Sequence, residues 1–576
     1  MQERISNIRG LFAKYKIDAY IVPSNDRYFS EYVHESAKRL QYMTNFSGSN
    51  GIVVICKDQA VFFTDGRYLE QSKRELEPKI FEIFDIKDLP YFPWDDYLGN
   101  DGILGYDAKL FTNVKLKIFS KIKPRLHKVS NNLVDQIWRN RPAEPSSKIC
   151  IYDDKFAGQS YSDKITMCRN LLTKYSADTM IVTAADSICW LLNLRASDIP
   201  YSPLMLAIIV LITKNQLYLF INPNRVDQDI ILARPHVTIL PSAQFADILS
   251  QANKVLIDEN FTSNYIIDLL STKIIEKIND PCQLAKARKN DIEINHAINS
   301  HIKDAVALCE FFAYLFELPN LQDQTEYDLG AILTEFRFKQ DQYVMDSFPT
   351  ICGFKENSAI IHYRATSTGA KKILGKGILL IDSGGQYNGC TTDVTRTFAI
   401  GGYPNKEQKL RYTQVLKGHI ALSMIKFPVN LITGGNLDVL ARQFLWRDGH
   451  DYPHGTGHGV GSFLSVHEGP QNISLRSNII LEPSMIVSNE PGYYKTNEFG
   501  IRIENLMYVK NTSQDENYLE FDTLTLVPYA KDLIDRRMLN ADEINYIKQY
   551  YQKIKQQVYP LLSIRGQKWL SNQLLF

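Results

Sequence analysis

The stretch ILLIDSGGQYNGCTTDV, residues 378–394, decides the fold of the C-terminal part of this chain. Its apolar first part is typical of a buried strand, and that strand ends in the carboxylate of Asp382. The dipeptide Asn388–Gly389 is a strong signal for a two-residue β-hairpin turn. If this turn forms, Tyr387 pairs with Cys390. We therefore predict a hairpin with polar side chains near its turn.

Counting outward from the turn places Asp382 and Asp393 on the same face of the hairpin. Gly384 lies opposite Asp393, and because side chains alternate along a strand, Asp382 is a diagonal neighbour of Asp393. Such neighbours lie about 7 Å apart at the backbone. Two carboxylates repel one another there unless a cation lies between them. The turn geometry alone leaves two interpretations open, a cation site or a polar turn with two solvated aspartates.

A second signal is the segment PHGTGHGVG, residues 453–461. His454 and His458 are four residues apart, as on a helix face, but each glycine of the segment would cost a helix about 1 kcal/mol. In an extended chain both histidines lie on one face and every glycine on the other, where a second backbone or a ligand can approach closely. A lone histidine is usually structural. This arrangement, followed by His467, indicates a functional site.

Two further carboxylates lie in strand-like segments near the C-terminus. Pro491 favours an extended conformation at Glu490. Glu504 and Arg502 share one face of an alternating strand. A hairpin would bring Glu490 and Glu504 together. Taken singly, however, a strand glutamate beside an arginine is more often a plain ion pair.

The combination of these groups indicates a metal centre. Four carboxylates and one histidine suit a pair of hard or borderline divalent ions such as Mn²⁺, Co²⁺ or Zn²⁺. Two ions about 3.5–4 Å apart require bridging carboxylates and generate a hydroxide nucleophile near neutral pH. The predicted ligands are Asp382, Asp393, His458, Glu490 and Glu504.

The rest of the chain reads as further domains. The first part alternates helix-like and strand-like patterns, which predicts an α/β layer fold. The second part repeats this order, since Asp178–Val182 resembles Asp18–Val22. A segment containing proline and serine, Arg141–Ser147, separates the two parts. The predicted fold class is α/β and α+β multidomain, and the predicted domains are residues 1–142, 143–285 and 286–576.

Composition and charge exclude several classes of protein. The chain has 576 residues, with 65 Lys plus Arg against 64 Asp plus Glu, and a net charge of +1 gives no support for nucleic acid binding. The N-terminus has no apolar signal-peptide segment. The most apolar run, Leu204–Ile212, is far shorter than the roughly 20 residues that span a bilayer, so no membrane partner is expected. None of the eight cysteines forms a CxxC pair, and free thiols favour the reducing cytoplasm.

At its predicted metal ligands the chain resembles the pita-bread metallopeptidases, whose ligands run Asp, Asp, His, Glu, Glu. Within them it resembles the long, three-domain cytosolic form of the Xaa-Pro aminopeptidases (aminopeptidase P). This resemblance implies two related, creatinase N-terminal-like α/β domains followed by a pita-bread catalytic domain with a C-terminal extension. The motifs that carry it are DSGGQYNGCTTDVTRTF, HGTGHGVGSFLSVHEGP, SNEPGYY, GIRIENL, SFPTICGFKENSAIIHYR, VPSNDRYFSEYV, TDGRYLEQ and WLLNLRASDIPYSP.

The resemblance also implies the role of each metal ligand. Asp382 would bind one ion, and His458 and Glu490 would bind the other. Asp393 and Glu504 would bridge the two ions. Mn²⁺ is the expected metal, with Zn²⁺ and Co²⁺ as alternatives. The implied state is a homodimer.

The implied reaction is hydrolysis of the first peptide bond of peptides with proline at the second position, by attack of a bridging hydroxide. His362, His454 and His467 match the substrate-handling histidines of the family. His467 or His362 would stabilise the oxyanion. Glu490 would carry a proton to the leaving proline nitrogen.

Two other functions remain open at this point. A prolidase shares these ligands but cleaves only dipeptides, so cleavage of an Xaa-Pro-Xaa tripeptide distinguishes it. A non-catalytic peptide-binding module can share the fold, but such modules have lost the ligands, and this chain retains all five. Methionine aminopeptidases share the ligands but lack two large N-terminal domains.

Overall fold

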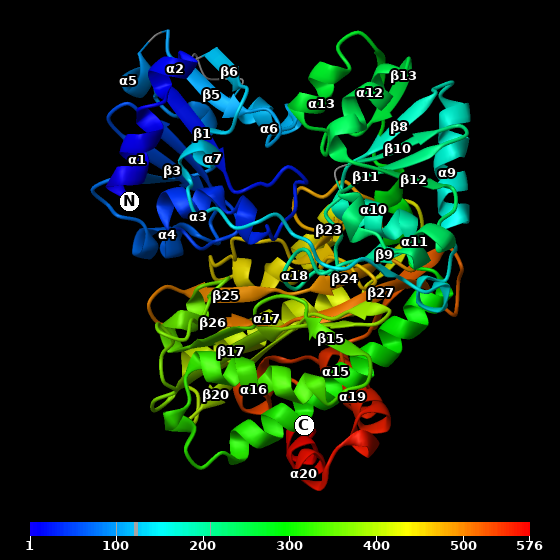
Figure 1. The fold of residues 1–576 in the computed structure, drawn as a ribbon. Helices are drawn as coiled ribbons and strands as arrows, with labels where there is room; N and C mark the ends of the chain where they lie inside the picture. The colour runs from blue at the N-terminus through cyan, green and yellow to red at the C-terminus, as the bar shows by residue number, and fades with distance from the viewer. Residues whose placement is uncertain (100, 120–124, 208, 576) are drawn as a thin grey trace. The chain divides into compact units, whose positions relative to one another are not determined.

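The computed structural model describes residues 1–99, 101–119, 125–207 and 209–575 (Figure 1). They divide into two units, one of residues 1–152 with 159–282 and the other of residues 153–158 with 283–576. Within the described residues, every helix is too short or too polar to cross a bilayer. The domain boundaries at residues 142 and 285 stay predictions.

The first unit contains two six-stranded sheets of the same topology, as far as the structure describes the chain. Each central strand, β1 or β8, has an antiparallel neighbour on one side and a parallel neighbour on the other. The prediction of two related α/β domains is therefore confirmed. The first sheet has the order β4 (Phe81–Asp85), β3 (Ala60–Thr64), β2 (Ile52–Cys56), β1 (Ala19–Pro23), β5 (Ile103–Asp107), β6 (Arg125–Val129). The second has the order β12 (Val237–Leu240), β11 (Leu217–Phe220), β10 (Ile209–Thr213), β8 (Thr179–Val182), β13 (Lys254–Ile257), β14 (Ile274–Lys277).

The repeated aspartate seen in the sequence occupies equivalent positions in the two sheets. Oδ2 of Asp18 accepts a hydrogen bond of 2.9 Å from the backbone N–H of Ile103, at the start of β5. Oδ2 of Asp178 accepts one of 3.1 Å from the backbone N–H of Lys254, at the start of β13. Each carboxylate thus ties the beginning of the central strand to its parallel neighbour.

Helices cover these sheets. In the first sheet, apolar side chains of α1, α3 and α7 pack on one face, and the other face packs against α5 and α6. The main helices beside the first sheet are α1 (Gln2–Arg9), α3 (Arg39–Thr44), α4 (Leu69–Glu75), α5 (Trp94–Leu98), α6 (Asn113–Leu116) and α7 (Leu133–Ile137). The main helices in the part of the chain that forms the second sheet are α9 (Tyr161–Lys174), α10 (Ala185–Leu192), α11 (Gln228–Ala233), α12 (Phe245–Ser250) and α13 (Asn264–Leu269).

The second unit is built on antiparallel strands. A central hairpin of β17 and β20 continues through β18 and β19 to the Asn388–Gly389 turn. The register pairs Tyr387 with Cys390, as predicted, and Asp382 with Thr395. The strands of this unit are β15 (Tyr343–Asp346), β16 (Ile351–Phe354), β17 (Gly377–Ser383), β18 (Gly385–Tyr387), β19 (Cys390–Thr391), β20 (Val394–Ile400), β21 (Lys426–Pro428), β22 (Gly457–Gly459), β23 (Glu468–Ile473), β24 (Ile486–Asn489), β25 (Gly492–Lys495), β26 (Phe499–Arg502), β27 (Asn505–Asn511) and β28 (Tyr518–Thr523).

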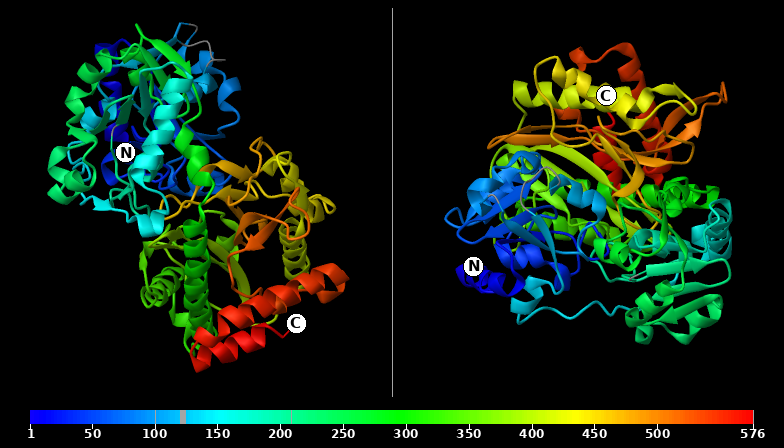
Figure 2. Two further views of the ribbon diagram at one scale, coloured as in Figure 1. Left: turned by 90° about the vertical axis from the view of Figure 1, so that its right-hand side faces the viewer. Right: turned by 90° about the horizontal axis from the view of Figure 1, so that it is seen from above.

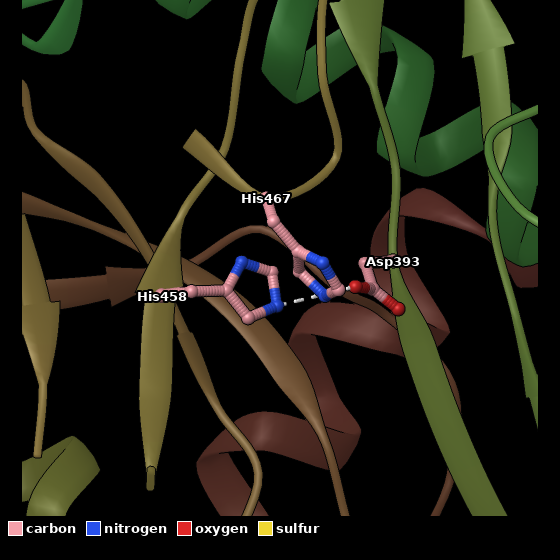
Figure 3. A group of neighbouring side chains, drawn as sticks. All are labelled: Asp393, His458 and His467. Carbon is pink, nitrogen blue, oxygen red and sulfur yellow. Dashed lines mark ion pairs between the residues drawn. The ribbon is translucent and has the colours of Figure 1, made fainter. Parts of the chain in front are cut away.

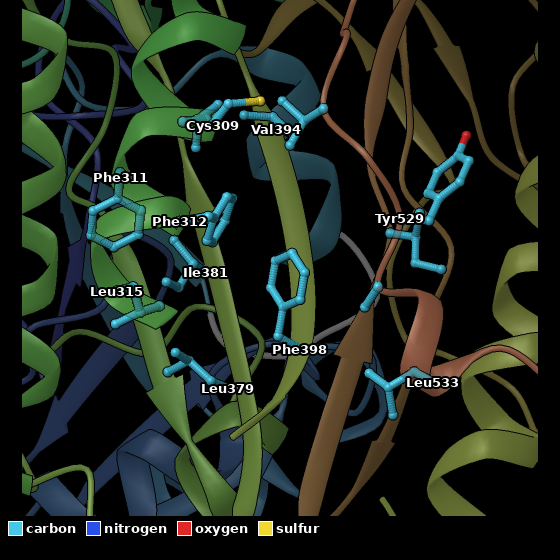
Figure 4. Close-up of a cluster of buried hydrophobic side chains, with 14 of the residues drawn as sticks. Cys309, Phe311, Phe312, Leu315, Leu379, Ile381, Val394, Phe398, Tyr529 and Leu533 are labelled. Carbon is cyan, nitrogen blue, oxygen red and sulfur yellow. The ribbon is translucent and has the colours of Figure 1, made fainter. Parts of the chain in front are cut away.

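A hydrophobic core fixes the central hairpin against the helices (Figure 4). Phe312 of the long helix α15 lies 4.7 Å from Phe398 of β20, measured between ring centroids. Trp569 of α20 stacks on Phe312 at 5.7 Å. The main helices are α15 (Asp291–Glu317), α16 (Glu326–Phe338), α17 (Lys406–Met424), α18 (Gly434–Trp446), α19 (Ala541–Gln557) and α20 (Ile564–Gln573). Figure 2 shows α19 and α20 at the C-terminal end. This packing holds the strand ends that carry Asp382 and Asp393.

Candidate metal centre

The structure brings the five predicted metal ligands together. Three overlapping groups of side chains each offer ligand atoms that lie within 4.8 Å of one another. These groups are Asp382 with Asp393 and Glu504, His458 with Glu490 and Glu504, and Asp393 with His458 and His467. The two aspartates come from the central hairpin, and the other ligands come from β22 and from the ends of β24 and β27.

Hairpin pairing explains how the two glutamates meet. β24 pairs with β27 so that Asn489 lies opposite Asn505, and β25 pairs with β26 so that Gly492 lies opposite Arg502. Glu490 and Glu504 lie between these pairs, in the same register. The predicted hairpin that joins the two glutamates is therefore confirmed.

The imidazole of His458 faces the carboxylate of Asp393 (Figure 3). Its Nε2 lies 3.5 Å from Oδ2 of Asp393 and 3.5 Å from Oε1 of Glu490. Its Nδ1 lies 2.9 Å from the carbonyl oxygen of Gly459, so Nδ1–H donates there and Nε2 is left for a ligand. The ring of His467 lies edge-on, with its centroid 4.3 Å from that of His458.

Burial and mutual repulsion raise the proton affinity of the carboxylates. Burial raises the pKa of Asp382 to about 7, because the charge of Asp393 adds to it and Arg502 only partly offsets it. Burial likewise raises the pKa of Glu490 and Glu504. For His458, burial lowers the pKa, but the hydrogen bond to Asp393 and the charge of Glu490 outweigh it and raise the pKa to about 9.

Unpartnered oxygen atoms show that the centre fits a pair of cations. Oδ1 of Asp382 and Oδ1 of Asp393 are buried and have no hydrogen-bond partner among the described residues. A buried carboxylate oxygen without a partner is costly. Divalent ions between the carboxylates would supply the missing partners and remove the repulsion. The donor set of four carboxylates and one imidazole suits Mn²⁺, Co²⁺ or Zn²⁺.

The protonation of the centre leads to a testable pH dependence. Raised pKa values mean that the folded chain without ions binds more protons than the unfolded chain, so stability is lost as pH rises, through about 7 for Asp382 and about 9 for His458. Metal ions replace these protons. We expect the gain in Tm on adding Mn²⁺ to be larger at pH 8.5 than at pH 6. Thermal unfolding measures this gain, and His458→Ala, which removes one proposed ligand, is the control. Equal gains at both pH values would contradict this.

Arg502 has a different partner from the one that its strand position suggests. Instead of pairing with Glu504, its Nη2 donates to Oδ2 of Asp382 at 2.7 Å. Its Nη1 donates to the hydroxyl of Tyr494 at 2.8 Å, and its Nε to Oγ1 of Thr395 at 3.1 Å. Arg502 therefore fixes the orientation of a ligand. The interpretation of a plain Glu504–Arg502 ion pair is wrong.

Two residues that support the ligands were not predicted. The hydroxyl of Thr395 donates to Oε2 of Glu504 at 2.7 Å. The hairpin register could have identified Thr395, because it lies opposite Asp382. The hydroxyl of Tyr494 joins Arg502 to His454, but nothing in the spacing of the motif SNEPGYY distinguishes this tyrosine from its neighbour.

The other predicted histidines differ in their relation to the ligands. Nε2 of His454 lies 2.9 Å from the hydroxyl of Tyr494, and its Nδ1 lies 2.8 Å from the carbonyl oxygen of Gly455. Through Tyr494 and Arg502 it is connected to Asp382. His362 lies in a turn and is half-buried. In the part of the chain that the structure describes, it belongs to none of the ligand groups.

The glycines beside His458 allow the close backbone approach that was predicted. A Cβ atom at Gly457 would lie 2.0 Å from the carbonyl oxygen of Ser488, and one at Gly459 would lie 2.3 Å from that of Glu468. The extended segment is shorter than predicted, because β22 covers only Gly457–Gly459. Thr456 precedes this strand, and its hydroxyl donates to Oδ1 of Asp438 at 2.6 Å.

Family models match nearly the whole chain. Metallopeptidase family M24 matches residues 296–511, and the C-terminal region of peptidase M24 matches residues 517–574. Two models of the creatinase/prolidase N-terminal domain match residues 4–137 and 140–293.

Relatives match over their full length. The chain is 38% identical to Xaa-Pro aminopeptidase 1 of Dictyostelium discoideum, covering 100% of this chain and 96% of the relative. It is 36% identical to aminopeptidase P2 of Arabidopsis thaliana, covering 99% and 88%. The crystal structure of X-prolyl aminopeptidase from Caenorhabditis elegans, described as a cytosolic enzyme with a di-nuclear active site, superposes with a TM-score of 0.93 at 32% identity, covering 100% of this chain and 99% of that one. The chain therefore belongs to the Xaa-Pro aminopeptidases of metallopeptidase family M24.

Proposed function

We propose that this protein is a metal-dependent aminopeptidase that hydrolyses the N-terminal Xaa-Pro bond of peptides. The observation that carries the proposal is the convergence of four carboxylates and His458 on one buried centre, with one oxygen of Asp382 and one of Asp393 lacking partners among the described residues. The relatives named Xaa-Pro aminopeptidase, matched from end to end, support the choice of substrate.

The five ligands would hold two divalent ions. Asp382 would hold one ion, His458 and Glu490 the other, and Asp393 and Glu504 both. When bound, such ions polarise the scissile carbonyl and lower the pKa of water. We propose Mn²⁺ as the native metal, since carboxylate-rich donor sets suit it.

The remaining side chains would handle protons and developing charge. Glu490 is half-buried beside His458, so it can accept a proton and deliver it to the leaving proline nitrogen. The imidazole of His467 lies next to His458 and can donate to the oxyanion. Arg502 keeps Asp382 oriented, and Tyr494 with His454 supports Arg502. We also propose His362 as a substrate-handling residue, from the family resemblance alone.

Three wider assignments belong to the same proposal. We propose domain boundaries near residues 142 and 285, which the matches of separate family models support. We propose a cytoplasmic location, in keeping with eight free cysteines and with the cytosolic relative. We propose a homodimer, from the family resemblance.

A tripeptide assay tests the proposed function and separates it from prolidase activity. We expect the metal-loaded protein to release the first residue of Ala-Pro-Ala, and to lose this activity in a chelator and regain it on addition of Mn²⁺, Co²⁺ or Zn²⁺. Ala-Ala-Ala is the matched control substrate. Cleavage of Ala-Pro alone would indicate a prolidase, and undiminished activity in the chelator would refute a metal mechanism.

A further inference from the structure

A buried cluster of two lysines and one glutamate includes Glu468, the residue that directly follows His467. Nζ of Lys286 lies 3.1 Å from Oε2 of Glu468, and Nζ of Lys289 lies 3.0 Å from Oε1. Lys289 also donates to the carbonyl oxygen of Lys286 at 2.8 Å. Their exposed fractions are 2%, 3% and 5% for Lys286, Lys289 and Glu468. Each carboxylate oxygen of Glu468 therefore forms an ion pair with one ammonium group, and Lys289 also donates a hydrogen bond to Oε1.

Such a cluster contributes little to the free energy of unfolding. Removing three charged groups from water carries a desolvation cost that their attraction offsets only partly. An apolar set of the same volume would often be at least as stable. A role in placing other groups accounts for the cluster better than stability does.

The position of Glu468 points to the groups that it places. It follows His467 directly, and its backbone pairs with Gly459, the residue after His458. This pairing is irregular: His458 pairs with Asn472, whereas Gly459 pairs with Glu468. An irregularity of this kind bends a strand and re-aims a side chain.

Close contacts also fix Glu468 beside the irregular pairing of β22 with β23. A Cβ atom at Gly459 would lie 2.3 Å from its carbonyl oxygen, and one at Gly461 would lie 2.7 Å from its Oε2. Backbone and carboxylate of Glu468 are thus both packed against the loop that follows His458. A shift of Glu468 would move His458 and His467 together.

We propose that Glu468, anchored by Lys286 and Lys289, is a positioning residue that sets the imidazoles of His458 and His467 relative to the carboxylates. The inference rests on the proposed function, because it gives these histidines their roles. Loss of the anchor lets β22 relax and moves Nε2 of His458 from its place 3.5 Å from Asp393 and Glu490. Mutation of a residue that supports metal ligands typically lowers metal affinity or activity by roughly 10–100-fold.

The test compares Glu468→Gln with Glu543→Gln in the full-length chain. Glu543 is a matched control because it also forms a largely buried pair with a lysine, Lys417, at 2.6 Å, but it ties α17 to α19 rather than to the ligands. Each metal-free protein is titrated with Co²⁺, and the visible absorption of the bound ion reports affinity and ligand geometry. Tm and the values of kcat and KM for Ala-Pro-Ala are measured in parallel.

We expect Glu468→Gln to weaken Co²⁺ binding roughly 10–100-fold, to alter the absorption spectrum and to lower kcat more than KM changes. Glu543→Gln is expected to lower Tm while leaving the affinity and the spectrum unchanged. If Glu468→Gln binds Co²⁺ with wild-type affinity and spectrum, the inference is overturned and the proposed function stands. If the wild-type chain takes up no Co²⁺, the proposed function itself fails.

A second variant keeps the test decisive if Glu468→Gln does not fold. Glu468→Asp retains the charge but withdraws the carboxylate from Lys286 and Lys289 by one methylene. It is expected to weaken Co²⁺ binding with a shifted spectrum. Wild-type binding by this variant would overturn the inference.

Discussion

Replacing Asp393 with asparagine is expected to lower kcat for Ala-Pro-Ala by about 10³-fold, equivalent to about 4 kcal/mol. Asp393 belongs to two of the three ligand groups, so it links the two halves of the centre. An amide of the same shape keeps the packing but removes one of the charges that hold the ions. Metal content should fall at the same time, because an amide oxygen is a poor bridge between two cations.

Asp542→Asn is the matched control for this variant. Asp542 is an exposed residue in the first turn of α19, so the same chemical change there is expected to leave kcat and metal content unaltered. Steady-state kinetics and elemental analysis of the purified proteins check both variants. Near wild-type turnover by Asp393→Asn would contradict a mechanism that depends on this carboxylate.

Replacing Arg502 with methionine is expected to destabilise the metal-free protein by about 3–5 kcal/mol. The ion pair with Asp382 is buried, with 2% and 11% of the two side chains exposed. Without the guanidinium, Asp382 lies beside the other carboxylates with no positive neighbour of its own. The carboxylate would also lose its orientation, so we expect weaker metal binding and a lower kcat.

Urea unfolding in a chelator measures this effect, and Arg537→Met is its control. Arg537 pairs with Asp535, but 89% of its side chain is exposed, so its removal should change stability little. Added Mn²⁺ is expected to restore part of the stability lost in Arg502→Met, because cations replace the missing positive charge. Equal unfolding midpoints for Arg502→Met and wild type in the chelator would show that Arg502 does not balance Asp382.

The parts of the fold that local chemistry determines could be predicted from the sequence. The Asn388–Gly389 turn fixes the hairpin register, and the register places Asp382 and Asp393 together. Asn290 and Glu293 form the capping box that starts α15, as their spacing suggests. These features depend on residues close together in the chain, so pattern and propensity suffice to find them.

Long-range contacts could not be predicted in the same way. Arg502 reaches Asp382 across the centre, 120 residues away in the chain, and alternation on its own strand pointed to Glu504 instead. The segment around His458 was expected to be extended over both histidines, but β22 covers only Gly457–Gly459, and the hydroxyl of Thr456 donates to Asp438. In both cases tertiary packing decides where a side chain points. The anchor of Lys286, Lys289 and Glu468 is a third such contact.

Anomalous X-ray diffraction from a crystal of the Mn²⁺-loaded protein tests the central claim most directly. The account predicts two Mn²⁺ peaks, each about 2–2.5 Å from oxygen atoms of Asp393 and Glu504, with Asp382 beside one ion and His458 with Glu490 beside the other. No peak among these five side chains, or full occupancy only at a site elsewhere in the molecule, would contradict it.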